Sequence, residues 1–151
     1  MMMTLISAGV WAQSLCVQRS GAVLRSAPRA SASPSWKVSK YMPLAGTGTF
    51  QNGFYQVQDV DGQTHWVASR DVSKKMNCGV VTVRRSLLRT GPGREFAAAR
   101  AGIADRYSPF LDLGGEDGWT QVQDEGGEKS WINLDHLWKP SRRMRMSFDH
   151  D

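Results

Sequence analysis

Two stretches of the chain alternate hydrophobic and polar residues, and each is followed by a second, shorter stretch of the same kind. The first is "FYQVQDV" (54–60), which leads through Asp61-Gly62 to "THWVA" (64–68). The second is "WTQVQDE" (119–125), which leads through Gly126-Gly127 to "KSWIN" (129–133). Alternation with a period of two indicates half-buried strands, and the turn residues tolerate the positive φ of a tight turn. Each stretch therefore predicts a β-hairpin.

The two hairpins belong to a repeat that covers most of the chain. Residues 53–72 align with residues 118–137 at a constant offset of 65, with seven identical pairs. Upstream, "VLRSAP" (23–28) matches "LLRTGP" (87–92), and "YMPL" (41–44) matches "YSPF" (107–110). A repeat of this kind decides the domain organisation. We predict two all-β units, residues 15–77 and 78–139, with a signal-like segment (1–14) before them and a flexible tail (140–151) after them.

One segment does not fit the strand pattern. The stretch "REFAAARAGIAD" (94–105) has helical propensity, whereas the equivalent positions of the first copy, "ASASPSWKVSK" (30–40), cannot form a helix. We give the repeat more weight than the propensity. We therefore predict a long loop over 94–105, with at most one helical turn.

The first fourteen residues, "MMMTLISAGVWAQS", are apolar and uncharged. They resemble a secretory signal peptide, with Val10 and Ala12 at the small-residue spacing of a cleavage site, although a basic n-region is missing. The alternative is an ordinary first strand. The run is too short to span a bilayer, so we predict no membrane span. The signal-like reading favours a periplasmic or secreted protein.

The net charge of +5 raises the possibility of an anionic partner. However, the positive charge is not gathered in one stripe, because residues 78–138 contain seven basic and nine acidic side chains. Together with the export-like start, this distribution argues against nucleic acid as the partner.

The chain has two cysteines, one at the start of each predicted unit. If the ends of each unit meet, Cys16 and Cys78 lie close together, and a disulfide between them would close the first unit in an oxidising compartment. The alternative is two buried thiols at equivalent strand positions. The chain contains no Cys-x-x-Cys motif and no spaced histidine pair, so we expect no metal site and no cofactor.

The residues that carry chemistry do not form a catalytic pattern. His65, His136 and His150 fall on a strand, a turn and the tail, and we interpret them as solvated or structural. Asp59 and Asp124 stand where the hairpin turns begin, which favours a role in Asx turns over acid–base chemistry. Neither cysteine has a motif that would activate it, and no phosphate-binding glycine loop is present. We predict that the chain is not an enzyme.

The segments "LRTGPG" (88–93), "YSPF" (107–110) and "DGWTQVQDEGGEKSWINLDHL" (117–137) together resemble the bacterial SH3-like (SH3b) domain family. The first copy departs further from the family pattern than the second, with Ala27 and His65 where glycine is usual and Phe54 in place of tryptophan. Ser130 also replaces a glycine in the second copy. The resemblance implies two tandem SH3-like β-barrels, an extracytoplasmic location and binding of peptidoglycan or of peptide partners.

The binding hypothesis rests on aromatic residues that fall at matched places in the two copies. Trp119 and Tyr107 are candidates for a surface groove, whereas Trp66 and Trp131 either join it or seal the two barrels as core residues. Arg89, like Arg25, either holds a ligand carboxylate or braces its turn through backbone carbonyls. The candidate ligand-binding residues are Tyr41, Phe54, Tyr55, Trp66, Arg89, Tyr107, Trp119 and Trp131.

From these features we predict a non-catalytic binding module of the cell envelope, which recognises peptidoglycan through its stem peptides. The alternative is an envelope adaptor that binds a partner protein through its aromatic residues.

Overall fold

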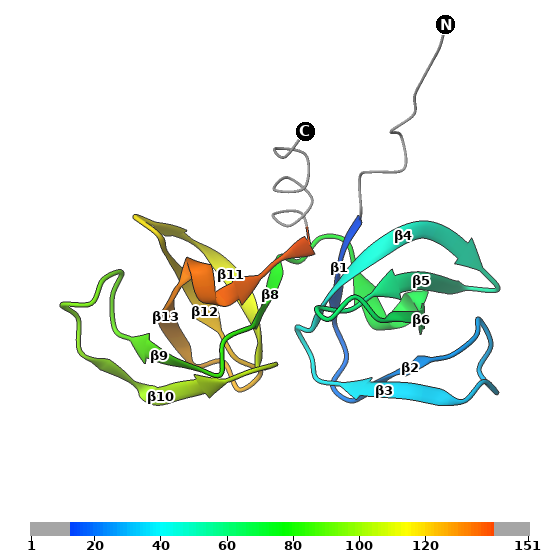
Figure 1. Cartoon of the computed structure of the whole chain (residues 1–151), viewed down its shortest axis with the longest axis horizontal. Helices are drawn as coiled ribbons and strands as arrows, with labels where there is room; N and C mark the ends of the chain where they lie inside the picture. The colour runs from blue at the N-terminus through cyan, green and yellow to red at the C-terminus, as the bar shows by residue number, and fades with distance from the viewer. Residues whose placement is uncertain (1–12, 141–151) are drawn as a thin grey trace, which may run out of the picture.

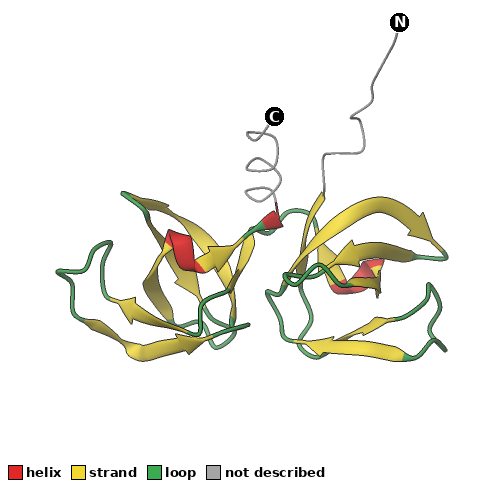
Figure 2. Ribbon diagram, viewed as in Figure 1, coloured by secondary structure: helices red, strands yellow, loops and turns green. Residues whose placement is uncertain are grey.

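The computed structural model describes residues 13–140, in which almost every regular element is a β-strand (Figures 1 and 2). The rest of the signal-like segment (1–12) and of the predicted tail (141–151) lies outside the described residues. Gln13 and Ser14, the last two residues of the signal-like segment, begin the first strand. The all-β prediction is confirmed.

The strands form two seven-stranded antiparallel sheets, one from each half of the repeat. The first unit contains β1 (Gln13–Val17), β2 (Ala22–Arg25), β3 (Pro34–Val38), β4 (Pro43–Gln51), β5 (Phe54–Gln58), β6 (Thr64–Ala68) and β7 (Val72–Ser73). The second unit contains β8 (Cys78–Val81), β9 (Arg85–Arg89), β10 (Ala98–Asp105), β11 (Pro109–Glu116), β12 (Trp119–Gln123), β13 (Lys129–Asn133) and β14 (Leu137–Trp138).

The two sheets have the same strand order. The first is ordered β3-β2-β6-β5-β4-β1-β7, and the second is ordered β10-β9-β13-β12-β11-β8-β14. A single 3-10 turn follows the hairpin in each unit, as η2 (Ser69–Asp71) and η3 (Leu134–His136). The predicted hairpins are β5–β6 and β12–β13, which pair along their full length. The repeat seen in the sequence is therefore a repeat of topology.

The loop predicted over 94–105 is wrong, because most of this segment is strand β10. It pairs with β9 and buries Ala99 and Ala104, and its register shifts between Ala98 and Ile103. Gly102 adopts a φ of 78° within this irregular stretch. Pairing with β9 satisfies the backbone and overrides the helical propensity of the alanines, while the bulge accommodates the extra residues.

Each unit has its own hydrophobic core, and strand β8 connects the two cores. Val81 belongs to the second core, whereas the neighbouring Val80 belongs to the first core. Trp138 on β14 also packs against the first core. Because β8 is buried on both faces, its sequence "CGVV" lacks the alternation of a half-exposed strand. The two units are therefore packed against each other.

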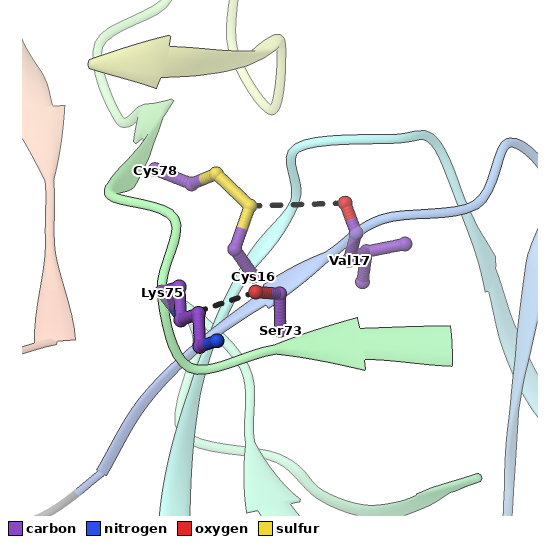
Figure 3. The surroundings of a disulfide bond; sticks show 5 residues. All are labelled: Cys16, Val17, Ser73, Lys75 and Cys78. Carbon is purple, nitrogen blue, oxygen red and sulfur yellow. Dashed lines mark hydrogen bonds between the residues drawn. A yellow bond between two sulfur atoms is a disulfide. The ribbon is translucent and has the colours of Figure 1, made fainter. Parts of the chain in front are cut away.

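A disulfide between Cys16 and Cys78 confirms the predicted pairing (Figure 3). The Cα atoms of the two cysteines are 5.8 Å apart, and both side chains are buried beside Tyr41. The cysteines do not occupy equivalent positions, since Cys16 lies opposite Pro43 and its counterpart opposite Pro109 is Val80. The bond therefore joins β1 of one sheet to β8 of the other.

Candidate functional site

Backbone hydrogen bonds place the two copies in register and allow their side chains to be compared. The Val17 amide donates to the Met42 carbonyl, and the Val81 amide donates to the Ser108 carbonyl, both over 3.0 Å. Arg25 and Arg89 are likewise equivalent, because they lie opposite Trp66 and Trp131 respectively. The two units differ at one end, where the side chains of the first unit are larger than those of the second. We call these ends the first mouth, between β3 and the β5–β6 turn, and the second mouth, between β10 and the β12–β13 turn.

The first mouth is filled by large side chains. Trp36 lies opposite Leu24 and packs against the first core, as does Val60 from the turn after β5. Met42 and His65 are buried, at 3% and 6% exposure. The ring centroids of Trp36 and His65 are 6.1 Å apart. Large side chains of the first unit therefore fill this end.

A chain of hydrogen bonds fixes His65 in the first mouth. Asp59 Oδ1 accepts two backbone amides of its own turn, those of residues 61 and 63, each over 2.9 Å, so the predicted Asx turn is confirmed. Asp59 Oδ2 lies 2.8 Å from His65 Nε2, which donates to it. His65 Nδ1 is 2.6 Å from Ser35 Oγ on strand β3. This link cannot be predicted from local sequence, because thirty residues separate Ser35 from His65.

The order serine, imidazole, carboxylate is also that of an activated serine nucleophile. Here the Trp36 ring lies beside His65 and packs on the core. We therefore interpret the hydrogen-bond chain as a link that ties edge strand β3 to the β5–β6 hairpin. The interpretation of His65 as structural fits this arrangement, in which the imidazole is buried rather than solvated.

The second mouth has the same frame but smaller or more polar residues. Opposite Leu88, the counterpart of Leu24, the chain has the irregular stretch 99–102, "ARAG", with a small residue at three of its four positions. At four further positions, a residue of the first copy is replaced by a smaller or charged one: Val38 by Ala104, Met42 by Ser108, Val60 by Glu125 and His65 by Ser130. This mouth is a cavity of about 360 Å³, near the lower end of the range for ligand pockets.

The cavity has an apolar floor and a charged rim. Its apolar lining includes Leu88, Ile103, Pro109 and Phe110. Lys40 of the first unit lines it as well, as do Asp124 and Glu125 from the turn after β12. The lining therefore combines one positive and two negative side chains with an apolar surface that suits an apolar group of a ligand.

Tyr107 connects the two mouths. Its hydroxyl donates to Asp61 Oδ2 over 2.9 Å, and its ring meets Trp36 edge to face with centroids 6.3 Å apart. The hydrogen bond to the Asp61 carboxylate raises the pKa of the Tyr107 hydroxyl. Tyr107 is 40% exposed and directly precedes Ser108 in the cavity lining. Among the candidate aromatic residues, Tyr107 is the one closest in sequence to a residue that lines the second mouth.

The other candidate residues do not form one groove. Tyr41 is buried beside the disulfide, and Tyr55 packs on Phe50 with ring centroids 4.9 Å apart. Phe54 lines a separate cavity of about 370 Å³ in the first unit, and Trp119 lines one of about 290 Å³ in the second.

Trp66 and Trp131 are half-buried, and neither belongs to a core cluster of the described residues. Each lies opposite the arginine of its own unit, Arg25 or Arg89. Both arginines donate Nη1 to a backbone carbonyl, Arg25 to residue 32 over 2.9 Å and Arg89 to residue 96 over 2.8 Å. The arginines therefore brace their turns, which was one of the two predicted roles.

The Trp119 cavity contains a second polar cluster. Asp112 Oδ2 pairs with Lys139 Nζ over 2.6 Å, and Asp112 Oδ1 accepts the Thr120 hydroxyl and the Gly114 amide. Burial acts to raise the pKa of Asp112, but these three hydrogen bonds outweigh it and lower the pKa below its ordinary value. The charges of Asp112 and Lys139 neutralise each other.

Comparison with known proteins assigns the chain to no family. No family model matches it, and no curated protein matches its sequence. Among solved structures it is similar to NlpC2 from Trichomonas vaginalis, with 13% identity and a TM-score of 0.37 over 85% of this chain and 48% of that chain. NlpC1 from the same organism gives 13% identity and a TM-score of 0.36, over 84% and 45%. The chain spans about half the length of these structures, and a likeness this weak carries no argument about function. Within residues 13–140, no helix is long and apolar enough to cross a membrane.

Proposed function

We propose that this protein is a non-catalytic binding module of the cell envelope, built from two tandem SH3-like barrels, and that it holds a peptide in the second mouth. One observation carries the proposal. The same frame is filled by large side chains in the first unit and encloses a cavity of about 360 Å³ in the second. A repeat that keeps its scaffold but opens one end provides a concave, partly apolar site with a few polar groups, as ligand sites usually do.

Peptidoglycan stem peptides suit the charges of this site. They carry free carboxylates, which Lys40 can pair with, and amino groups, which Asp124 and Glu125 can pair with. Their alanine side chains are small enough to lie on the apolar floor. The rim therefore favours a short peptide that bears both signs of charge.

A periplasmic or secreted location accompanies this proposal. Disulfides persist in oxidising compartments and are rare in the cytosol, and the Cys16–Cys78 bond is one of the features that hold the two units together.

An envelope adaptor is the second candidate function, and strand β10 favours it. This strand is the last in its sheet, is eight residues long and is mostly exposed. An edge strand of this kind can pair with an extended segment of a partner protein.

A pull-down with purified sacculi tests the first candidate. The full disulfide-bonded chain is expected to be retained at low salt, and Lys40→Glu is expected to reduce retention because it reverses the only cation that lines the second mouth among the described residues. Lys74→Glu changes the net charge equally on the exposed surface of the first unit and serves as the control. Absence of retention of the unmodified chain would exclude peptidoglycan as the ligand. Equal losses in both variants would show non-specific attraction.

A further inference from the structure

We infer that the second mouth accepts an aromatic side chain, with tryptophan as the best fit, presented by an extended segment of a partner protein. The inference rests on the proposed peptide site in the second mouth, and it favours the envelope adaptor over peptidoglycan by naming the side chain that a partner protein presents. The chain itself supplies the template, because the first unit already holds a tryptophan in the equivalent place.

Trp36 shows how an indole sits in this frame. It lies opposite Leu24, packs on the first core and lies beside His65. In the second unit the position opposite Leu88 belongs to the stretch 99–102, which contains no aromatic residue. The cavity is thus located where the repeat would place an indole.

The walls that would surround an indole are retained. Leu24 and Pro43 of the first unit correspond to Leu88 and Pro109 of the second, and both members of the second pair line the cavity. Phe110 adds an aromatic ring to the lining. An inserted tryptophan would meet apolar surface on these sides, and aromatic residues gain the most from such burial.

The residues that pack around Trp36 in the first mouth also have smaller counterparts in the second mouth. Met42 is replaced by Ser108 and His65 by Ser130, so the side chains that help Trp36 to fill its space have no bulky counterparts. Because several large side chains are replaced together, the second mouth is larger than a single small gap in packing.

A partner segment can approach along strand β10. The outer edge of β10 is unpaired within its sheet, and Ile103 on this strand is 54% exposed and lines the cavity. An extended segment that pairs with β10 can direct one side chain into the mouth, because strand side chains alternate between the two faces. Charged neighbours of that side chain would meet Lys40, Asp124 or Glu125. A stem peptide lacks the aromatic group, so this feature favours a protein partner.

Titration of the full, disulfide-bonded, ¹⁵N-labelled chain tests the inference. The probes are the capped peptide Gly-Ser-Trp-Ser-Gly, the same peptide with alanine in place of tryptophan, and a soluble muramyl tripeptide. The tryptophan peptide is expected to shift the amide signals of Ala101, Ala104 and Ser108. Its affinity is expected to exceed that of the alanine peptide by about 30-fold or more, the loss typical of truncating a hot-spot aromatic.

Two alanine-to-tryptophan variants provide a matched control. Ala101→Trp fills the mouth from an exposed position in its lining and is expected to abolish binding of the tryptophan peptide. Ala97→Trp adds the same side chain at an exposed position outside both the lining and strand β10, and it is expected to leave binding unchanged. Amide spectra of both variants also report whether the fold is intact.

The outcomes separate this inference from the function on which it rests. Binding of the muramyl tripeptide without binding of the tryptophan peptide would overturn the inference and leave the proposed function standing. Equal binding of the tryptophan and alanine peptides, or equal effects of the two variants, would also overturn it. Absence of binding by all three probes would refute both the inference and a peptide site in this mouth.

Discussion

Removal of the Cys16–Cys78 disulfide is expected to destabilise the first unit by about 4 kcal/mol. The bond closes a loop between residues separated by 62 positions, and this loop contains nearly all of the first sheet. The loop-closure relation for a loop of this length gives a loss of about 14 cal/mol/K in the entropy of the unfolded chain, or about 4 kcal/mol at 25 °C. Typical domains have a free energy of unfolding of roughly 5–15 kcal/mol, so the effect is large.

The assay is urea unfolding of three proteins: the oxidised chain, the chain reduced by a phosphine, and the double variant Cys16→Ala, Cys78→Ala. Both changes act on the unfolded state, so the reduced chain and the double variant are expected to lose similar stability. Because the closed loop contains the first unit, hydrogen exchange is expected to accelerate in β1–β7 more than in β9–β14. A loss below about 1 kcal/mol, or a loss confined to the second unit, would refute the loop-closure argument.

Three further changes test the polar contacts. His65→Ala removes the partner of Asp59 Oδ2 in a buried site and is expected to lower the free energy of unfolding by about 1–3 kcal/mol, measured by urea unfolding; an unchanged midpoint would contradict the structural role. The lowered pKa of Asp112 predicts that its stabilising contribution is complete above about pH 4 and is lost as the pH falls through the folded-state pKa. Asp112→Asn, which also breaks the pair with Lys139, is therefore expected to make the free energy of unfolding less dependent on pH below about 4, measured by urea unfolding. In a spectrophotometric titration, Tyr107→Phe is expected to remove the tyrosine that ionises above the ordinary range, and a difference spectrum centred on the ordinary pKa would exclude the Tyr107 contact with Asp61.

The sequence was sufficient to predict the parts of the fold that repeat. The hairpins β5–β6 and β12–β13 follow from alternation and turn residues. The equal strand order of the two sheets follows from the matches that recur in the same order in both copies, at offsets of 64 to 66. The paired cysteines were one of two open alternatives. Strand β10 was missed because its alanines favour a helix locally, and pairing with β9 is a tertiary effect that local propensity does not contain.

The site was less predictable than the fold. Aromatic residues at matched positions suggested a single groove, but the matched positions mostly carry the scaffold, and Tyr41 and Tyr107 show that one position can be buried in one unit and exposed in the other. The second mouth differs from the first because it lacks large side chains. Ala101 and Ser108 have no chemical signature in the sequence, and they indicate a site only when the structure sets them against Trp36 and Met42.

The divergence of the two mouths also has an energetic consequence that relates stability to binding. Smaller side chains in a packed region usually make a domain less stable, so we expect the smaller residues of the second mouth to cost the second unit some stability. The contacts that offset it lie at the junction, where Val80 and Trp138 pack on the first core and the disulfide holds β8 against β1. A ligand that fills the second mouth would recover part of the missing packing.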